Sequence, residues 1–371
     1  MTFRIKDIIK VIEKIAPLRL AEKWDNTGMQ VGHNDWPVQN IWVALDPLPE
    51  VIDAACQNKV DLLITHHPLI FQPIKSVDFS TSTGSIIQKA CQHKLAIISA
   101  HTNYDNAQNG MNDILSSKIG LKSLKVLNAL HSTLYKLVIF LPVEYETAVL
   151  NSFFETTAGV IGKYSCCSFR SKGKGTFKPH YLAKPFIGKS NEISNVEEVR
   201  LETIVKENDL EDVINQIKKV HPYEKMAYDV YKILDLDSLE GTGRVGKLEN
   251  NTKLSSFALE IKKKLNLSYV NYAGNPDLII EKVAVCAGSG ASLLNHFFSS
   301  GAQVYVSGDF KYHDARAVQA SNLGLIDIGH FASELIFIEY FTKLLEKKMY
   351  DKGIDVNIKQ CTLEKDPFMK G

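Results

Sequence analysis

The feature of this chain that most restricts its fold is an alternation of short apolar runs with amphipathic segments, which occurs twice. From residue 40 to about 128, the runs IWVALDP, VDLLIT and LAIISA alternate with stretches of helical periodicity such as PEVIDAACQNK and SIIQKACQHK. The alternation returns near residue 278 with LIIEKVAVCAG, VYVSGD and LIDIG. Such patterns are typical of parallel strands joined by crossover helices. The sequence predicts an outer α/β domain built from two chain segments, 1–128 and 240–371.

The segment between these halves has a different pattern. It contains YKLVIFLP, EYETAVLNSFFETTAG, VEEVRLETIVKEN, DLEDVINQIKKV and KMAYDVYKIL, which indicate one β-α-β unit followed by another. That order is the ferredoxin-like arrangement, and it predicts an inserted α+β domain over residues 133–236. Between Arg170 and Ser190 the chain is rich in glycine, proline and lysine and has no acidic residue. We expect a solvated loop there, with an anion-binding surface as the alternative.

Composition narrows the class of protein. The chain has 371 residues, 45% of them hydrophobic and 23% charged, as in ordinary soluble globular proteins. A formal net charge of +1 makes nucleic acid an unfavoured partner. No apolar run approaches the roughly 20 residues that span a bilayer, and the charged N-terminal segment does not resemble a signal peptide. We therefore expect a cytoplasmic protein with no membrane contact.

Polar side chains collect at the carboxyl ends of the predicted strands. VDLLIT is followed by His66 and His67, LAIISA by His101, VYVSG by Asp309 and LIDIG by His330. Ligand sites in open α/β sheets form at this edge, because the strands stop together and their loops leave a crevice. One such residue would indicate little, since a single histidine at a strand end is usually a hydrogen-bonded structural residue. Several strand ends of this kind predict a shared site.

The adjacent His66 and His67 can serve one site only if the strand ends before them. Neighbouring side chains of a continuing strand point to opposite faces. Pro68 favours an ended strand, because it supplies no N–H to a ladder and biases the preceding residue towards an extended conformation. The sequence therefore places the pair in a loop.

Spacing adds two carboxylates to these imidazoles. His101 and Asp105 are four residues apart, as are His330 and Glu334, an offset that puts two side chains on one helical face. Histidine and carboxylate ligands without thiolates suit Zn²⁺, Mn²⁺, Fe²⁺ or Co²⁺. The set suffices for two ions, and a two-metal hydrolytic site is its natural use.

Further polar residues lie in the turns WDNTGMQVG and SGDFKYHDA. They are interpreted either as turn formers and helix caps or as parts of an active site, and both interpretations stay open. In the second interpretation, the candidates for proton transfer are Asp309 and His313, and the candidates for substrate contact are Asp25, Asn26, Lys311 and Tyr312.

The blocks WDNTG, ITHHP, AHTNYD, SGDFKYHDA and GHFASE, in that order, resemble the signature blocks of the NIF-three-like family, the GTP cyclohydrolase I type 2 homologues. The blocks cover both outer segments, and the central segment is similar to the PII-like or CutA-like insert of longer bacterial members. The resemblance implies a homohexameric toroid with metal sites facing an internal cavity. It implies a dinuclear centre, with His101 close by, whose ligands are His66, His67, Asp105, His330 and Glu334.

Two classes of function remain open at this point. The first is a hydrolase that binds two divalent ions per chain, with Zn²⁺ preferred over Mn²⁺, Fe²⁺ or Co²⁺, and acts on a nucleotide as a GTP cyclohydrolase or a phosphohydrolase. The second is a ring-shaped binding or regulatory protein without turnover, in which the metals stabilise the assembly. The residues alone do not choose between them.

Overall fold

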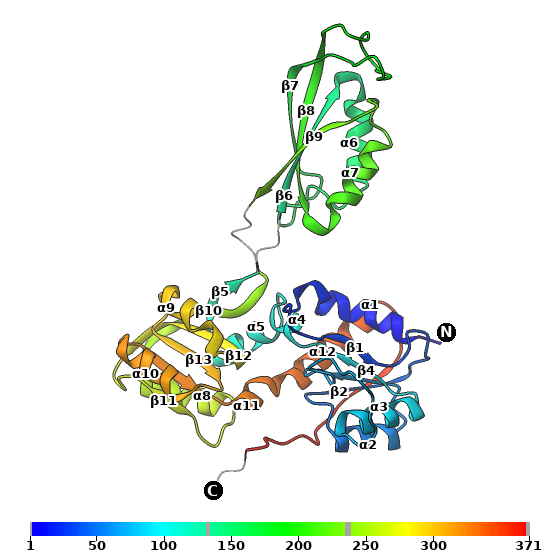
Figure 1. Cartoon of the computed structure of the whole chain (residues 1–371). Helices are drawn as coiled ribbons and strands as arrows, with labels where there is room; N and C mark the ends of the chain where they lie inside the picture. Colours follow the sequence, from blue (N-terminus) through cyan, green and yellow to red (C-terminus); the bar gives the residue numbers. More distant parts are fainter. Residues whose placement is uncertain (1, 131–133, 234–238, 369–371) are drawn as a thin grey trace. The chain divides into compact units, whose positions relative to one another are not determined.

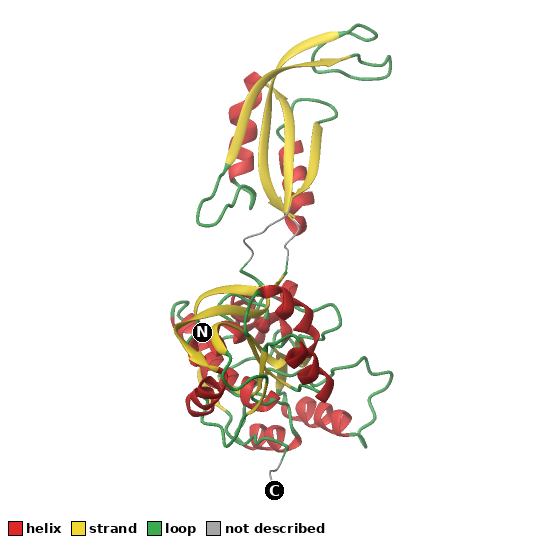
Figure 2. Ribbon diagram, turned by 90° about the vertical axis from the view of Figure 1, so that its left-hand side faces the viewer, coloured by secondary structure: helices red, strands yellow, loops and turns green. Residues whose placement is uncertain are grey.

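The structure, a computed structural model, describes residues 2–130, 134–233 and 239–368, which form two compact units (Figure 1). The first unit contains the described residues up to 130 and from 239 onwards, and the second contains residues 134–233. The insert boundaries predicted above, residues 133 and 236, lie outside the described residues. Both units combine helices and strands, so the chain has a mixed α/β fold with several sheets (Figure 2).

A five-stranded sheet in the first unit has the order β1-β4-β3-β2-β15. Its strands are β1 (Gly28–Val31), β2 (Asn40–Ala44), β3 (Leu62–Thr65), β4 (Ala96–Ser99) and β15 (Asn357–Gln360). All neighbours run parallel except β1, which is antiparallel to β4. One apolar cluster joins the sheet to α2 (Pro49–Gln57) and α3 (Ser82–His93), and another joins it to α1 (Ile5–Ile15), α5 (Met111–Ile119) and α12 (Ile336–Tyr350).

A six-stranded sheet completes this unit, in the order β11-β14-β13-β12-β10-β5. Its strands are β5 (Lys122–Ala129), β10 (Gly241–Lys253), β11 (Asn271–Ala273), β12 (Ile279–Ser289), β13 (Val304–Gly308) and β14 (Gly324–Asp327). Strands β12, β13 and β14 are parallel, and the others pair antiparallel. The helices packed on it include α8 (Leu254–Lys264), α9 (Leu294–Ser300) and α10 (Tyr312–Ala320).

The largest apolar cluster contains residues from both sheets and from α1, α5, α8 and α12. Every residue of β3, β4 and β13 is buried, as expected for parallel strands covered on both faces. This burial explains why these strands read as uninterrupted apolar runs in the sequence. The two sheets therefore share one core in this unit.

The second unit has the element order β6 (Leu134–Pro142), α6 (Glu146–Phe154), β7 (Ser168–Phe177), β8 (Ser194–Lys206), α7 (Leu210–Lys218) and β9 (Ala227–Ile233). Its four strands form an antiparallel sheet in the order β7-β8-β6-β9. Side chains from one face of β6 and β8 pack with α6 and α7 in a separate apolar cluster. Single-turn 3-10 helices occur in both units, at Leu18–Leu20, Val143–Tyr145, Glu207–Asp209 and Ala291–Leu293.

The expectation of a loop from Arg170 to Ser190 is wrong in its first part. Residues Ser168–Phe177 form β7, which pairs with β8 along its whole length. Glycine and lysine are poor strand formers, but β7 is an edge strand whose side chains are largely exposed, so backbone pairing decides its conformation.

Within the ranges described, no helix is long and apolar enough to cross a membrane.

A buried ion pair ties the two chain segments of the first unit together. Arg244 on β10 is 2% exposed and donates to both carboxylate oxygens of Asp113 on α5, over 2.7 and 2.8 Å. Its remaining N–H groups reach the backbone carbonyls of Gly241, Gly243 and Ala107. The guanidinium therefore donates hydrogen bonds to both chain segments of the first unit, the one before residue 130 and the one after residue 239.

Removing the charge of Asp113 is expected to destabilise this unit. In Asp113→Asn the buried guanidinium loses its counter-charge, which costs roughly 3–5 kcal/mol in the free energy of unfolding. The matched control is Lys247→Gln on the same strand, because Lys247 pairs with Glu281 at the surface and such pairs contribute about 0–1 kcal/mol. Urea denaturation of both variants measures the difference. Equal losses would contradict a special role for the buried pair.

Candidate metal centre

The chain turns immediately after β3, and the turn explains how two adjacent histidines reach one place. The N–H groups of His66 and His67 both donate to the carbonyl of Leu45, over 3.1 and 3.0 Å. The Thr65 hydroxyl donates to the His67 carbonyl over 2.7 Å. The strand therefore ends at Thr65, as predicted, and the two imidazole rings lie 5.1 Å apart between centroids.

Two short helices supply the other candidates. His101 is the N-cap residue of α4 (Thr102–Asp105), and Asp105 is its last residue. His330 and Glu334 are the first and last residues of α11 (His330–Glu334). Each pair therefore has the one-turn offset that the spacing predicted.

The structure brings these residues into two overlapping groups. The ligand atoms of His66, His67 and His101 lie within 4.8 Å of one another, and so do those of His67, His330 and Glu334. His66 Nε2 lies 3.7 Å from Asp105 Oδ1, which places the second carboxylate beside the first group. Either group could hold a metal ion.

The carboxylate of Glu334 is the meeting point of three imidazoles. Its Oε2 lies 3.0 Å from the Nε2 atoms of both His67 and His330, and its Oε1 lies 3.6 Å from Nε2 of His66. The Glu334 side chain is only 4% exposed. Gly288 leaves the room that this carboxylate needs, because a Cβ there would lie 2.2 Å from Oε1.

The other ring nitrogen of each histidine is already engaged. Nδ1 of His66 donates to the backbone carbonyl of Ala100 over 2.9 Å, so its Nε2 carries the lone pair. The Nδ1 atoms of the other three rings lie 2.6–2.8 Å from carboxylate oxygens, in the pairs His67–Asp46, His101–Asp25 and His330–Asp309. Metal-binding histidines have this arrangement, because an acceptor at one nitrogen orients the ring and fixes the tautomer.

Buried atoms without hydrogen-bond partners indicate which kind of ligand the cluster can bind. Within the described part of the chain, His66 Nε2, Asp105 Oδ1 and Glu334 Oε2 are buried and have no hydrogen-bond partner. Lone pairs that face each other at these distances repel unless a proton or a cation lies between them. A cation is therefore the ligand that this set of nitrogen and oxygen donors fits.

Comparison with known proteins gives the family. Residues 3–367 match the model of the Duf34/NIF3 (NGG1p interacting factor 3) family. The chain belongs to this family. The resemblance predicted from the sequence blocks is thereby confirmed.

Relatives of this Duf34/NIF3 chain cover nearly all of it. It is 40% identical over 364 residues to the GTP cyclohydrolase 1 type 2 homolog of Bacillus subtilis, covering 98% of this chain and 97% of that protein. It is similar to the solved structure of a Bacillus cereus protein related to NIF3, with a TM-score of 0.82, 35% identity and full coverage of both chains. A Staphylococcus aureus protein, SA1388, matches with a TM-score of 0.85 and 29% identity, covering 100% of this chain and 99% of that one.

The electrostatics of the cluster favour protons or a cation beside Glu334. Burial disfavours the charged form of His67, but the nearby carboxylates of Asp46 and Glu334 outweigh it and raise its pKa to about 10. The nearby carboxylate of Glu334 raises the pKa of His330 to about 9 despite burial. Burial also opposes the charge of Glu334, yet the surrounding imidazoles hold its pKa well below the usual value. A metal ion that entered this cluster would therefore displace protons.

The turn residues of the sequence analysis have mixed positions. Asp25 and Asp309 lie against the cluster, where they accept from His101 and His330. Asn26 lies in the loop beside it and donates to the carbonyl of Ile70 over 2.6 Å. Substrate contact by Asp25 or Asn26, and proton transfer by Asp309, stay predictions.

Three further candidates lie on the start of α10. Lys311, Tyr312 and His313 are exposed, and the Tyr312 hydroxyl accepts from Arg316 over 2.9 Å. In the part of the chain that the structure describes, no hydrogen bond or ion pair joins these three side chains to the histidine cluster. Their roles in substrate binding and catalysis also stay predictions.

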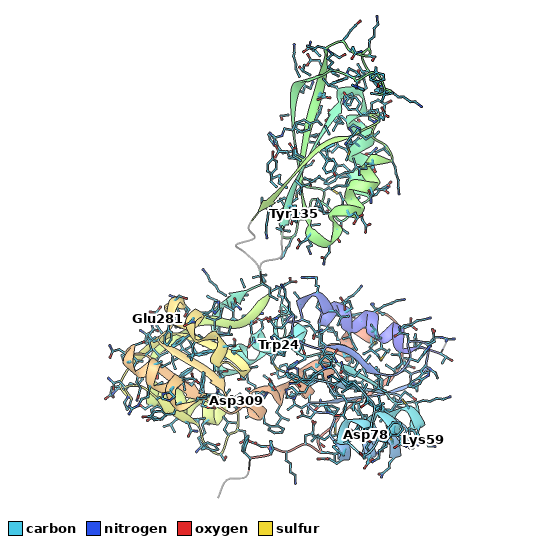
Figure 3. All side chains as sticks on the ribbon, in the orientation of Figure 1. Trp24, Lys59, Asp78, Tyr135, Glu281 and Asp309 are labelled. Atoms are coloured by element: carbon cyan, nitrogen blue, oxygen red, sulfur yellow. The ribbon has the colours of Figure 1, made fainter. Side chains whose placement is uncertain are left out.

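Sequence reasoning missed three neighbours of the cluster. Asp46 directly follows the apolar residues of the run IWVALDP, so the strand-end rule could have found it. Trp24 and Phe71 carry no such signal; they are 60% and 52% exposed, and their ring centroids lie 5.8 Å apart. Both rings lie near His101, at 6.1 and 6.4 Å. Figure 3 labels Trp24, which lies near His101, and Asp309, which lies near His330.

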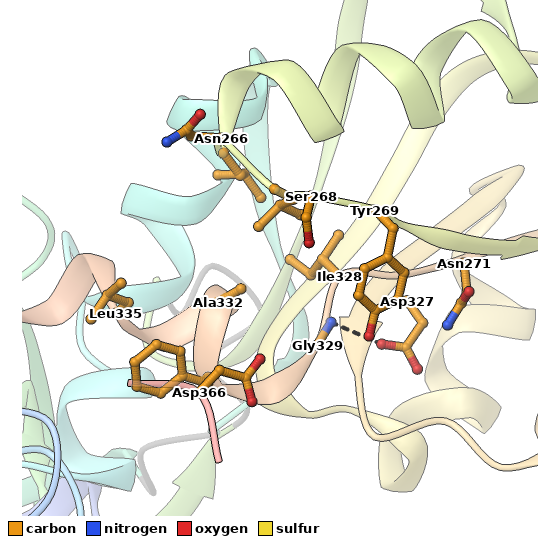
Figure 4. Close-up of a pocket in the computed structure, with 13 residues that line it drawn as sticks. Asn266, Ser268, Tyr269, Asn271, Asp327, Ile328, Gly329, Ala332, Leu335 and Asp366 are labelled. Carbon is orange, nitrogen blue, oxygen red and sulfur yellow. Dashed lines mark hydrogen bonds between the residues drawn. The ribbon is translucent and has the colours of Figure 1, made fainter. Parts of the chain in front are cut away.

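A pocket of about 310 Å³ lies on a neighbouring face of α11 (Figure 4). It is lined by Phe331, Ala332 and Leu335 of this segment, whereas His330 and Glu334 belong to the cluster. The Asp327 carboxylate accepts from the N–H of Gly329 over 2.9 Å, as the dashed line shows, and so fixes the turn before His330. The pocket adjoins the cluster without containing its ligand atoms.

The support given to His67 leads to a prediction about metal affinity. In Asp46→Ala the ring loses the acceptor at Nδ1, so the affinity of the chain for Zn²⁺ should fall about 10- to 100-fold. Competition with a chromogenic chelator measures it. Asp53→Ala removes a carboxylate that pairs with Lys89 at the surface and serves as the control. An unchanged affinity in Asp46→Ala would show that Asp46 does not support a ligand.

Proposed function

We propose that this Duf34/NIF3 chain is a hydrolase that depends on two divalent metal ions and acts on a nucleotide. The observation that carries the proposal is the convergence of imidazole Nε2 atoms on buried carboxylate oxygens that have no hydrogen-bond partner among the described residues. The proposed ligands are His66, His67, Asp105, His330 and Glu334, with His101 beside them. Zn²⁺ suits this donor set best, and Mn²⁺, Fe²⁺ or Co²⁺ are the alternatives.

The chemistry of such a centre is hydrolytic. When bound, two divalent ions lower the pKa of water and stabilise negative charge on a substrate oxygen. The residues of the chain have separate tasks: the ligands fix the reaction site, and their carboxylate partners keep the rings oriented. Proton transfer is proposed for Asp309, whose side chain is 46% exposed beside His330, and for His313.

The aromatic side chains beside the cluster support a substrate with a planar ring. Trp24 and Phe71 leave much of their apolar surface exposed next to His101, and such surfaces bind aromatic rings by stacking. Hydrogen bonds hold the segments of Trp24 and Phe71 together: Asn26 donates to the Ile70 carbonyl, and the Ile70 N–H donates to the Gln30 side chain over 3.2 Å. A nucleotide base is the planar group that fits this proposal.

Two reactions are consistent with these features. In a GTP cyclohydrolase reaction, water adds at C8 of guanine, the imidazole ring opens with its nitrogen taking the proton, and a second water releases formate. In a phosphohydrolase reaction, water attacks phosphorus, the P–O bond to the rest of the nucleotide breaks and its oxygen takes the proton, and phosphate is the second product. The two products distinguish the reactions experimentally.

The second unit and the assembly belong to the same proposal. We propose that residues 133–236 are a ferredoxin-like insert of the PII or CutA type in an outer domain made of residues 1–128 and 240–371. The strand order β7-β8-β6-β9 with two helices supports this assignment. We also propose a homohexamer, supported by the exposed apolar side chains after β3, which are Ile74, Val77 and Phe79.

The test compares metal-loaded wild type with Glu334→Gln, using GTP and other nucleoside triphosphates. Release of formate indicates the cyclohydrolase and release of phosphate the phosphohydrolase. Loss of the central carboxylate should lower turnover at least about 100-fold. The control is Glu339→Gln, which removes a surface carboxylate that pairs with Lys343.

Sedimentation of the same samples separates hydrolysis from the second class of function. A hydrolase predicts that Glu334→Gln keeps its oligomer and loses turnover. A metal-stabilised scaffold predicts no turnover in wild type and loss of assembly in the variant. The second result would contradict the proposal.

A further inference from the structure

The second unit contains a pocket of about 340 Å³ whose lining includes none of the proposed metal ligands. It is lined by β7 and β8, by the segment after β7, and by the turn before β9. Its apolar walls include Phe177 and Phe186. Its volume is in the range of pockets that bind small molecules.

Aromatic rings form much of this pocket. The Tyr223 ring lies 6.1 Å from that of Phe177 and 6.4 Å from that of Phe186, and Phe186 also meets Tyr145 at 5.5 Å. The faces of such rings carry partial negative charge and attract cations.

A carboxylate lies among these rings. Glu198 on β8 accepts from the Tyr223 hydroxyl through Oε1 over 2.8 Å. Gly175 on β7 makes room for the carboxylate, because a Cβ there would lie 2.2 Å from Oε2. Considering residues 134–233 and the rest of the described chain, Oε2 has no hydrogen-bond or ion-pair partner.

Basic residues next to Glu198 are paired with other acids. Lys174 lies 3.4 Å from Glu197, and Arg200 lies 3.1 Å from Glu202. These cations therefore do not neutralise Glu198, although they occupy the same pair of strands.

The lining has a surplus of negative charge. It includes two acids, Glu198 and Glu224, and one base, Lys225, which is exposed. Glu224 accepts from the backbone N–H of Lys184 over 2.7 Å, which holds the segment after β7 against the turn before β9. The charge of the lining thus favours a cationic ligand.

A buried histidine, His221, fixes the position of Tyr223. Nε2 of His221 lies 3.0 Å from the Phe140 carbonyl and donates to it, and Nδ1 accepts from the Tyr223 N–H over 3.2 Å. His221 is 8% exposed. These contacts make His221 a structural residue, and the pocket wall that it supports is preorganised.

We propose that this pocket binds a free small organic cation, in which an ammonium or guanidinium group on an apolar body contacts Glu198 Oε2 and the aromatic faces. The Glu198 carboxylate would form a charge-assisted hydrogen bond with the cationic group of the ligand. The rings of Phe177, Phe186 and Tyr223 would contact both this cationic group and the apolar body. All the lining residues belong to the second unit, so the site would give this unit a ligand of its own.

Calorimetric titration of the full chain with 2-phenylethylammonium tests the proposal, with phenylacetate as a probe of similar shape and opposite charge. We expect saturable binding of the ammonium and none of phenylacetate. Glu198→Gln should weaken binding about tenfold or more. Glu197→Gln removes the same charge from the neighbouring position of β8 and should bind as wild type does.

A second variant keeps the test decisive if Glu198→Gln does not fold. Phe186 is 51% exposed, so Phe186→Ala should fold, and it should weaken binding several-fold by removing one ring face. The proposal is overturned if wild type shows no saturable binding, if phenylacetate binds equally well, or if Phe186→Ala and a folded Glu198→Gln bind as wild type does.

Discussion

The candidate metal centre depends on the hydrogen bonds that engage Nδ1 of each imidazole. The carboxylates of Asp25, Asp46 and Asp309 and the carbonyl of Ala100 occupy these nitrogens. Each ring is thereby held with its Nε2 directed into the cluster, where Glu334 is buried. Without these acceptors the rings could rotate and exchange tautomers, and the donor atoms would no longer converge. The unpartnered buried atoms are the consequence of this orientation, and a cation is what relieves their repulsion.

The fold supplies these groups from positions that are far apart in the chain. The first sheet presents residues at the ends of β2, β3 and β4, and the second presents them at the ends of β13 and β14, across the core that both sheets share. Glycines permit the close approach: a Cβ on Gly288 would collide with Glu334, and one on Gly308 would lie 2.6 Å from the backbone nitrogen of His330. Parallel topology therefore brings the histidines together, and small residues let α11 enter the site.

Much of this arrangement could be predicted from the sequence, because it follows local rules. Strand ends and four-residue offsets selected His66, His67, His330 and Glu334, which the structure brings together. Asp46 follows the same rule and was overlooked. The approach of Trp24 and Phe71 could not be predicted, since it rests on a tertiary hydrogen bond from Asn26 to a segment 44 residues away. The edge strand β7 was missed for a related reason, because pairing with β8 overrides the weak strand propensity of its residues.

The metal content of the chain tests the central claim most directly. Elemental mass spectrometry on protein purified without an affinity tag should find about two equivalents of Zn, Mn, Fe or Co per chain. The double variant His66→Ala, His67→Ala should lose them, whereas replacing the exposed His33 and His93 in the same way should not. Folded wild type that contains none of these metals and cannot be loaded with any of them would contradict the account, and the paired histidines would then be structural.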